Sequence, residues 1–157
     1  MLASGLLLTN IYNSLVDARS WSFSFPVSVE TARMYYKNVN PGDFYRLFSP
    51  VNQVLALLCV IFAWRSGKKA RLFLVAALLV FVLADIFTFA YFYPRNSIIF
   101  KAGIADNAAA IQKALQEWSA ANWGRSALVL AGIICSAAGL NAVYGKEAAP
   151  VQQHSTR

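Results

Sequence analysis

The chain has 157 residues, of which 58% are hydrophobic and only 13% are charged. Ordinary soluble domains are about half apolar and one quarter charged, so this composition excludes a typical soluble fold. The net charge of +7 could suggest nucleic acid, but the basic residues occupy connections between apolar runs. Anionic lipid headgroups bind basic residues placed in this way. We therefore expect an all-α integral membrane protein that contacts membrane lipid and binds no nucleic acid.

The residues that usually bind metals are nearly absent from the apolar runs. Cys59 and Cys135 both lie inside such runs and are not spaced as a metal clip or a redox pair. The single histidine, His154, lies in the polar tail. This distribution argues against a His-ligated haem, copper or iron site in the membrane region. We expect no metal and no cofactor.

The first segment, residues 2–18, is a short apolar helix with a polar stripe. Gly5, Thr9, Asn13 and Asp17 recur at every fourth position, which places them on one helical face. The stripe could pack against neighbouring helices or could belong to a functional site, and both interpretations stay open. No basic residue precedes the apolar core, which favours a retained helix over a cleaved signal peptide.

Three further spans are expected at residues 48–64, 72–93 and 123–144. The connection 19–48 is rich in aromatic residues and contains a Pro41-Gly42 turn, and Pro94 is expected to end the third span. An amphipathic helix beginning at Asp106 precedes the fourth span, either lying on the membrane surface or running directly into it. The prediction is one domain, residues 1–145, built as an up-down-up-down four-helix bundle, followed by a polar tail, 146–157.

Two further features concern orientation and assembly. The link 65–71 carries four cations, so by the positive-inside rule it faces the cytoplasm together with both termini. We expect a bacterial inner membrane or its equivalent. Small residues recur at four-residue spacing on the fourth span, and stripes of this kind allow helices to approach closely. They form a possible homo-oligomer face: Ala127, Ala131, Cys135 and Gly139.

Alternation of the four spans brings the polar membrane residues to one half of the bilayer. Asp85 is the one charge within the third span, and an ionisable group in hydrocarbon usually faces the bundle interior. We expect a pocket there, with Arg125 or Arg46 available to neutralise Asp85 or Asp17. The alternative is a network of interhelical hydrogen bonds without chemistry. The remaining polar residues of this half are Asn13, Asn52, Gln53, Thr88 and Asn122.

Several short motifs resemble a family of small four-helix membrane proteins whose fungal branch includes the anthrone oxygenases. They are the polar first span, Pro41-Gly42-x-Phe44-Tyr45-Arg46 before Pro50, Tyr93-Pro94-Arg95-Asn96, and Trp118-x-x-x-Asn122-x-x-Arg125.

The resemblance implies cofactor-independent oxygenation, in which a base removes a proton from an anthrone-like carbon and the carbanion reacts with dioxygen. Asp85 would be the base. Many relatives have a histidine where this chain has Asn122, so the chain departs from the family at the position of the most natural base. Substrate orientation and stabilisation of negative charge would fall to Asn13, Asn52, Asn122 and Arg125. With Asp17, Arg46, Thr88 and Trp118, these residues form the predicted substrate site.

Two classes of function remain open at this point. One is an enzyme that acts on a lipophilic aromatic molecule. The other is a non-catalytic membrane protein, either a binder of hydrophobic ligands or a small subunit of a larger complex. A transporter is the weakest reading, because four spans with one buried acid offer little machinery for alternating access.

Overall fold

The computed structural model describes residues 2–145, so the predicted polar tail and His154 lie outside the described residues. The described chain is all-helical and contains no strand. Its elements in order are α1 (Leu2–Tyr12), the π-helical turn η1 (Asn13–Asp17), α2 (Ala18–Phe23), α3 (Val27–Tyr35), α4 (Pro41–Phe62), α5 (Lys68–Phe87), the π-helical turn η2 (Thr88–Phe92), α6 (Tyr93–Lys101) and α7 (Ile104–Tyr144).

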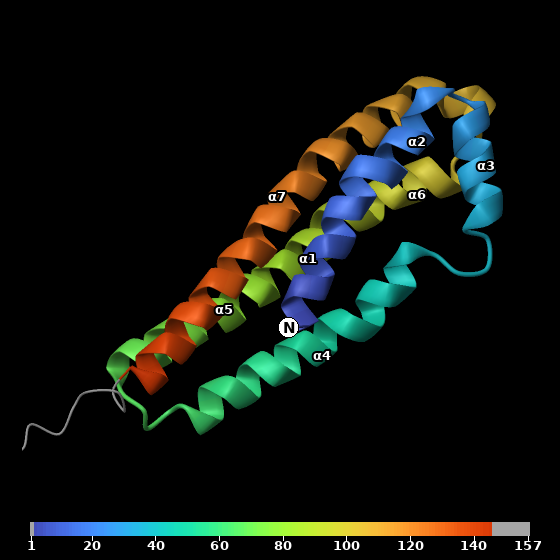
Figure 1. Cartoon of the computed structure of the whole chain (residues 1–157). Coiled ribbons are helices and arrows are strands. Elements are labelled where there is room, and N and C mark those ends of the chain that lie inside the picture. Colours follow the sequence, from blue (N-terminus) through green and yellow to red (C-terminus); the bar gives the residue numbers. More distant parts are fainter. Residues whose placement is uncertain (1, 146–157) are drawn as a thin grey trace, which may run out of the picture.

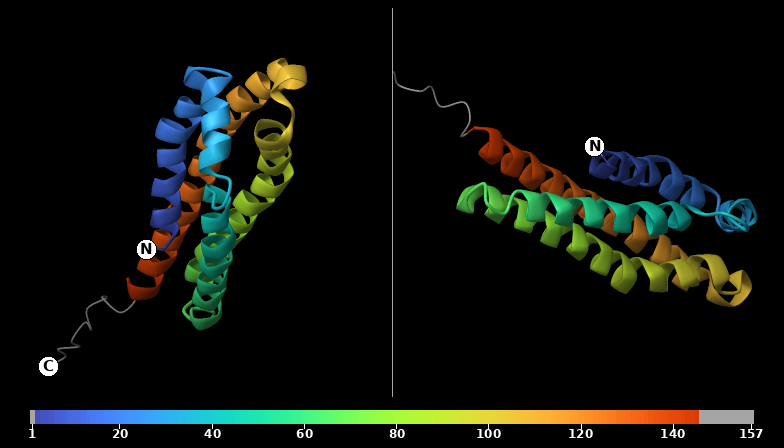
Figure 2. Two further views of the ribbon diagram at one scale, coloured as in Figure 1. Left: turned by 90° about the vertical axis from the view of Figure 1, so that its right-hand side faces the viewer. Right: turned by 90° about the horizontal axis from the view of Figure 1, so that it is seen from below.

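The long helices surround a shared interior. Helix α7 packs along α5 and α1, and α4 packs against α5 and α1, so the contacts run in a ring through these four helices. Figure 1 shows α7, in orange, lying beside α5 and α1, and the views of Figure 2 agree. Helix α3 lies at the end of the molecule where α2, α6 and the start of α7 meet (Figure 1).

The buried apolar side chains form two separate clusters. The cluster at the α3 end is aromatic and is built around Trp21, Phe92 and Trp118 with Ile99 and Ile111. The second cluster lies between α1, α5 and α7, where its buried members are Leu6, Ala77, Phe81, Ala84 and Val129.

The contact between α5 and α7 depends on two glycines. A Cβ at Gly132 would collide with the ring of Phe81, and one at Gly139 would come within 2.7 Å of Leu74. Both positions therefore need glycine for this close approach. Of the small stripe on this helix, Gly139 and the half-buried Cys135 face the inside of the chain, whereas Ala127 and Ala131 are exposed.

Helix α4 begins at Pro41, which is earlier than the predicted start of the second span at residue 48. Asn40 caps the helix by accepting a hydrogen bond from the Gly42 amide at 2.8 Å, and Asp43 completes a capping box. Proline is favoured in the first helical turn because backbone N–H groups there have no acceptor within the helix, so a residue without an N–H loses no hydrogen bond. The Pro41-Gly42 pair therefore starts a helix and is not a separate turn.

The third helical segment also continues past Pro94, contrary to the prediction. The π-helical turn η2 precedes the proline, which then occupies the first turn of α6, a position that tolerates proline. Of the two alternatives for the amphipathic helix, the structure shows the second: it runs directly into the fourth predicted span as α7, with non-helical dihedrals at Asn107.

Three helical stretches are long and apolar enough to cross a membrane: Pro41–Phe62, Lys68–Lys101 and Ile104–Tyr144. Many of their large apolar side chains are exposed, for example Leu55, Leu79 and Ile134. This outward apolar surface fits a membrane protein, in which lipid covers such faces.

Candidate functional site

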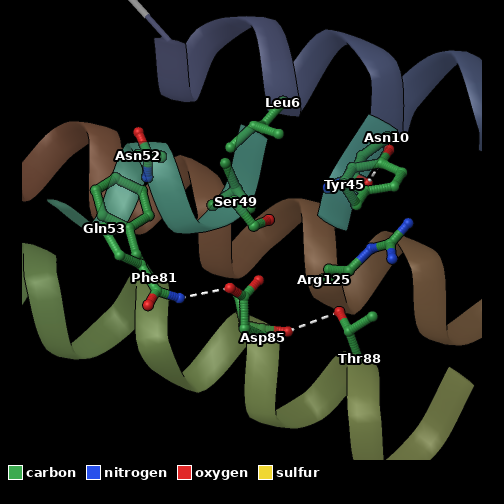
Figure 3. Close-up of a pocket in the computed structure, with 12 residues that line it drawn as sticks. Leu6, Asn10, Tyr45, Ser49, Asn52, Gln53, Phe81, Asp85, Thr88 and Arg125 are labelled. Carbon is green, nitrogen blue, oxygen red and sulfur yellow. Dashed lines mark hydrogen bonds between the residues drawn. The ribbon is translucent and has the colours of Figure 1, made fainter. Parts of the chain in front are cut away.

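A small cavity lies between α1, α4, α5 and α7 (Figure 3). Its volume is about 30 Å³. A cavity of about 10–15 Å³ is enough to hold one water molecule. Both polar and apolar residues line the cavity. It is lined by Leu6, Asn10, Tyr45, Ser49, Asn52, Gln53, Phe81, Ala84, Asp85, Thr88, Arg125 and Val129.

Asp85 projects from α5 into this cavity. The side-chain amide of Gln53 on α4 donates a hydrogen bond to the Asp85 carboxylate. Figure 3 shows Ser49, also on α4, facing Asp85 across the cavity. One turn further along, the Thr88 hydroxyl donates to the Ala84 carbonyl at 2.8 Å. The carboxylate is thus held between two helices and still borders open space.

Arg125 is a buried cation on α7, with an exposed fraction of 6%. One of its terminal nitrogens donates to the side-chain oxygen of Asn122 at 2.6 Å. The guanidinium carbon lies 4.7 Å from the ring centre of Tyr45 and 4.5 Å from that of Phe92, which are cation–π distances. Within residues 2–145 the side chain forms no ion pair, and its Nε has no hydrogen-bond partner.

A hydrogen-bond network joins α1, α4 and α7 beside the guanidinium. The Tyr45 hydroxyl donates to the Asn10 side-chain oxygen at 2.7 Å and accepts from the Asn13 amide at 3.2 Å. Asn122, which is fully buried, donates to the Asn10 main-chain oxygen at 2.8 Å and to the Ser14 hydroxyl at 2.6 Å. This network fixes the positions of Asn122 and Tyr45, the two neighbours that hold Arg125.

A second, larger cavity of about 520 Å³ lies toward the α3 end. Ligand pockets usually measure roughly 300–1,000 Å³. Trp118 forms part of the wall, with its indole nitrogen donating to Asn96 at 2.9 Å. The aromatic lining residues are Trp21, Tyr36, Tyr45, Phe92, Tyr93, Phe100 and Trp118, and the cationic ones are Arg33, Lys37, Arg46, Lys101 and Arg125.

Tyr36 lies in the wall of the large cavity, outside the long apolar helices. Burial, together with the negative charge of nearby Asp17, raises the pKa of the Tyr36 phenol to about 12. Tyr36 is therefore a neutral hydrogen-bond donor at physiological pH.

Tyr45, Thr88 and Arg125 line both cavities and thus separate them. Of the predicted site residues, Asn52 and Asp85 line the small cavity, and Asn13, Arg46 and Trp118 line the large one. Asn122 and Asp17 line neither: the first binds Arg125, and the second lies beside Asn13, 2.9 Å from its amide nitrogen when that group is turned toward it.

Of the two cations expected to neutralise the acids, only Arg125 lies in the same cavity as one of them. Arg46 pairs with Asp43 on its own helix, at 3.2 Å, with 66% of its side chain exposed. It is therefore occupied by a neighbour one helical turn away. Arg125 shares the small cavity with Asp85 but forms no ion pair with it.

The predicted substrate site leaves out Asn10, Tyr45, Gln53 and Phe92, although Gln53 is expected in the same half of the membrane as the pocket. Asn10 was visible as a polar neighbour of the stripe on the first segment, and Gln53 as a polar residue next to Asn52. Tyr45 falls in the aromatic-rich connection 19–48, before the predicted start of the second span. No signal in the sequence marks Phe92 among its aromatic neighbours.

Comparison with known proteins identifies one family. A family model described as anthrone oxygenase matches residues 44–135, which include α5, η2, α6 and most of α4 and α7. No curated protein and no solved structure matches the chain. The matched region includes Asp85, Thr88 and Arg125 and covers more than half of the chain. The chain therefore belongs to the anthrone oxygenase family.

Proposed function

We propose that this protein is a membrane-embedded oxygenase that acts on a lipophilic aromatic substrate without a cofactor. The observation that carries the proposal is Arg125, a buried guanidinium with no ion pair among residues 2–145, at the junction of two cavities in a member of the anthrone oxygenase family. A buried cation aimed at open space stabilises negative charge that develops on a bound molecule.

The reaction converts an activated methylene group to a ketone. A base removes one proton, the resulting carbanion adds dioxygen, and protonation gives a hydroperoxide that loses water. One oxygen atom of O₂ remains in the ketone and the other leaves as water, so dioxygen is the only oxidant and no external reductant is consumed. The negative charge of the carbanion is delocalised onto the oxygen of the conjugated ring carbonyl, and Arg125 stabilises the charge on this oxygen.

The substrate occupies the large cavity, since the small one is of water size. Thr88 and Tyr45 lie at the boundary between the cavities, and Asp85 lies beyond it. Asp85 acts as the base through one water molecule in the small cavity, a distance over which general bases work. Asn13 and Trp118 orient the substrate, Asn122 positions Arg125, and Asn52 borders the water.

The protein spans a membrane four times in an up-down-up-down bundle, with Leu2–Phe23 as the first span. The three long apolar stretches and the cationic link 65–71 support this arrangement, with both termini in the cytoplasm of a bacterial cell or its equivalent. Lipid covers the apolar outer faces. Exposed Ala127 and Ala131 support a homo-oligomer contact along α7.

The test uses purified protein in neutral detergent with anthrone as substrate, following anthraquinone formation and oxygen uptake. We expect a protein-dependent rate with one O₂ per anthrone and one labelled oxygen in the quinone from ¹⁸O₂. The rate should be insensitive to chelators, and the protein should be colourless. Formation no faster than spontaneous oxidation would contradict the proposal.

The second candidate function is non-catalytic binding of a hydrophobic ligand, which the volume and aromatic walls of the large cavity favour. Tight anthrone binding without turnover would support it. A stoichiometric protein partner that co-purifies would instead support a subunit of a membrane complex.

A further inference from the structure

The large cavity has an unbalanced charge. Its lining contains five cationic side chains and, among the described residues, no acidic one. Three of the five are already engaged: Arg46 pairs with Asp43, Arg33 donates to the Ile99 carbonyl at 2.9 Å, and Arg125 donates to Asn122.

The other two cations are Lys37, which follows α3, and Lys101, which ends α6. Both side chains are exposed, and neither forms an ion pair within residues 2–145. Helices α3 and α6 contact each other, so the two lysines come from adjoining elements at one end of the cavity. They leave positive charge at the rim that no side chain of the described chain neutralises.

Below this rim the walls are largely aromatic. The ring centre of Trp21 lies 5.1 Å from that of Trp118 and 5.3 Å from that of Phe100, and Phe92 lies 5.4 Å from Trp118. Edge-to-face packing of this kind holds the rings rigidly. A planar ligand can therefore bury its rings against the wall while a charged substituent stays at the rim.

We infer that the large cavity selects an aromatic ligand that carries an anionic substituent, such as a carboxylate, bound by Lys37 and Lys101 while its rings lie on the aromatic wall. This inference rests on the proposed function, whose substrate it narrows from any lipophilic aromatic to an anionic one. Charge-assisted hydrogen bonds from two ammonium groups supply the selectivity. The charge of Arg125 lies deeper and remains available for the reacting oxygen.

The test compares two tricyclic probes of nearly equal size, 9-anthracenecarboxylate and the neutral 9-anthracenemethanol. The full-length protein in uncharged detergent is titrated with each, and binding is read from energy transfer between tryptophan and the probe, since two of the four tryptophans line the cavity. We expect the carboxylate to bind at least about tenfold more tightly, in keeping with charge-assisted pairing.

The variant K37Q/K101Q should reduce carboxylate affinity to about that of the alcohol and leave alcohol binding unchanged. The matched control is K68Q/K69Q, which removes the same charge from the first turn of α5, at the opposite end of the molecule (Figure 1). The control should bind both probes like the wild type. Unchanged alcohol binding also shows that the rim variant is folded.

Equal affinity of the wild type for both probes would overturn the inference, and so would an equal loss of carboxylate binding in the control variant. Displacement of the carboxylate by phosphatidylglycerol mixed into the micelles would also overturn it, by assigning the lysines to a lipid headgroup. In each of these cases neutral anthrone could still be oxidised, so the proposed function would stand. Absence of binding by either probe would contradict both proposals.

Discussion

The side-chain amide of Asn122 donates to the main-chain oxygen of Asn10 at 2.8 Å, and so joins α7 to α1 across 112 positions of sequence. Its other donor interaction is with Ser14, and its oxygen accepts from Arg125. One fully buried amide thus connects the polar stripe of the first helix with the cation between the two cavities. The first helix is in this way coupled to the candidate site.

Replacement of Asn122 by Leu should destabilise the protein by about 1–3 kcal/mol, because buried polar groups lose their partners. Asn141→Leu is the control, since Asn141 lies on the same helix with an exposed side chain, and a change within about 0.5 kcal/mol is expected there. The measurement is reversible unfolding in mixed micelles, followed by circular dichroism. Equal stability of the two variants would show that the network does not stabilise the fold.

Gly132→Ala should also destabilise the protein, because the new methyl group collides with the ring of Phe81. Overpacking of this kind costs about 1–3 kcal/mol. Gly124→Ala on the same helix meets nothing within 4 Å, so it should be neutral or stabilising by up to about 1 kcal/mol, in line with helix propensity. The double variant Gly132→Ala with Phe81→Leu should recover part of the loss, and lack of recovery would argue against this contact.

Substitution of Arg125 by Met should lower kcat for anthrone oxidation by about 10²–10³-fold, the usual loss when a group that stabilises an oxyanion is removed. Arg125→Lys should retain part of the rate, because it keeps the charge but not the planar group between Tyr45 and Phe92. Asp85→Asn should lower kcat by about 10²–10⁴-fold, as expected for a lost base, with little change in KM. If all three variants matched the wild type in kcat, the assigned roles would be wrong.

The raised pKa of Tyr36 predicts that the folded protein loses stability at high pH. Its pKa is about 12 in the folded protein, compared with about 10 in an unfolded chain. The unfolded state therefore releases the proton first, so this contribution is complete below pH 10 and disappears as the pH rises toward 12. Between pH 9 and 11 the melting temperature of the wild type should fall further than that of Tyr36→Phe. Parallel curves would contradict the assignment.

The two cysteines report on the membrane arrangement. Cys59 is exposed on α4, within an apolar stretch long enough to cross a membrane, and Cys135 is half-buried on α7. In lipid vesicles Cys59 should react with a lipophilic maleimide and resist a charged, water-soluble one, because hydrocarbon excludes the charged reagent. Detergent extraction or unfolding should not be needed for the lipophilic reaction. Rapid labelling of Cys59 by the charged reagent in intact vesicles would contradict a span at α4.

The helical nature of the chain and the positions of the apolar stretches followed directly from composition and length, because both depend on local sequence. Helix ends were harder. Pro41 and Pro94 predicted breaks, but a proline in the first turn of a helix, after the cap at Asn40 or after the π-helical turn η2, is compatible with helix. The hydrogen bonds that decide between these outcomes are not encoded in residue spacing alone.

The candidate site, too, could be predicted from the sequence only in part. The sequence by itself determined that Asn13, Asp85 and Arg125 belong to one level of the molecule, since helix length and alternation fix depth. Only the tertiary structure decided their neighbours: Asp85 meets Gln53, whereas Arg125 lies between Tyr45 and Phe92 at the boundary of two cavities. The physical reason is that depth follows from rise per residue along one helix, while lateral contacts depend on how several helices rotate and pack against one another.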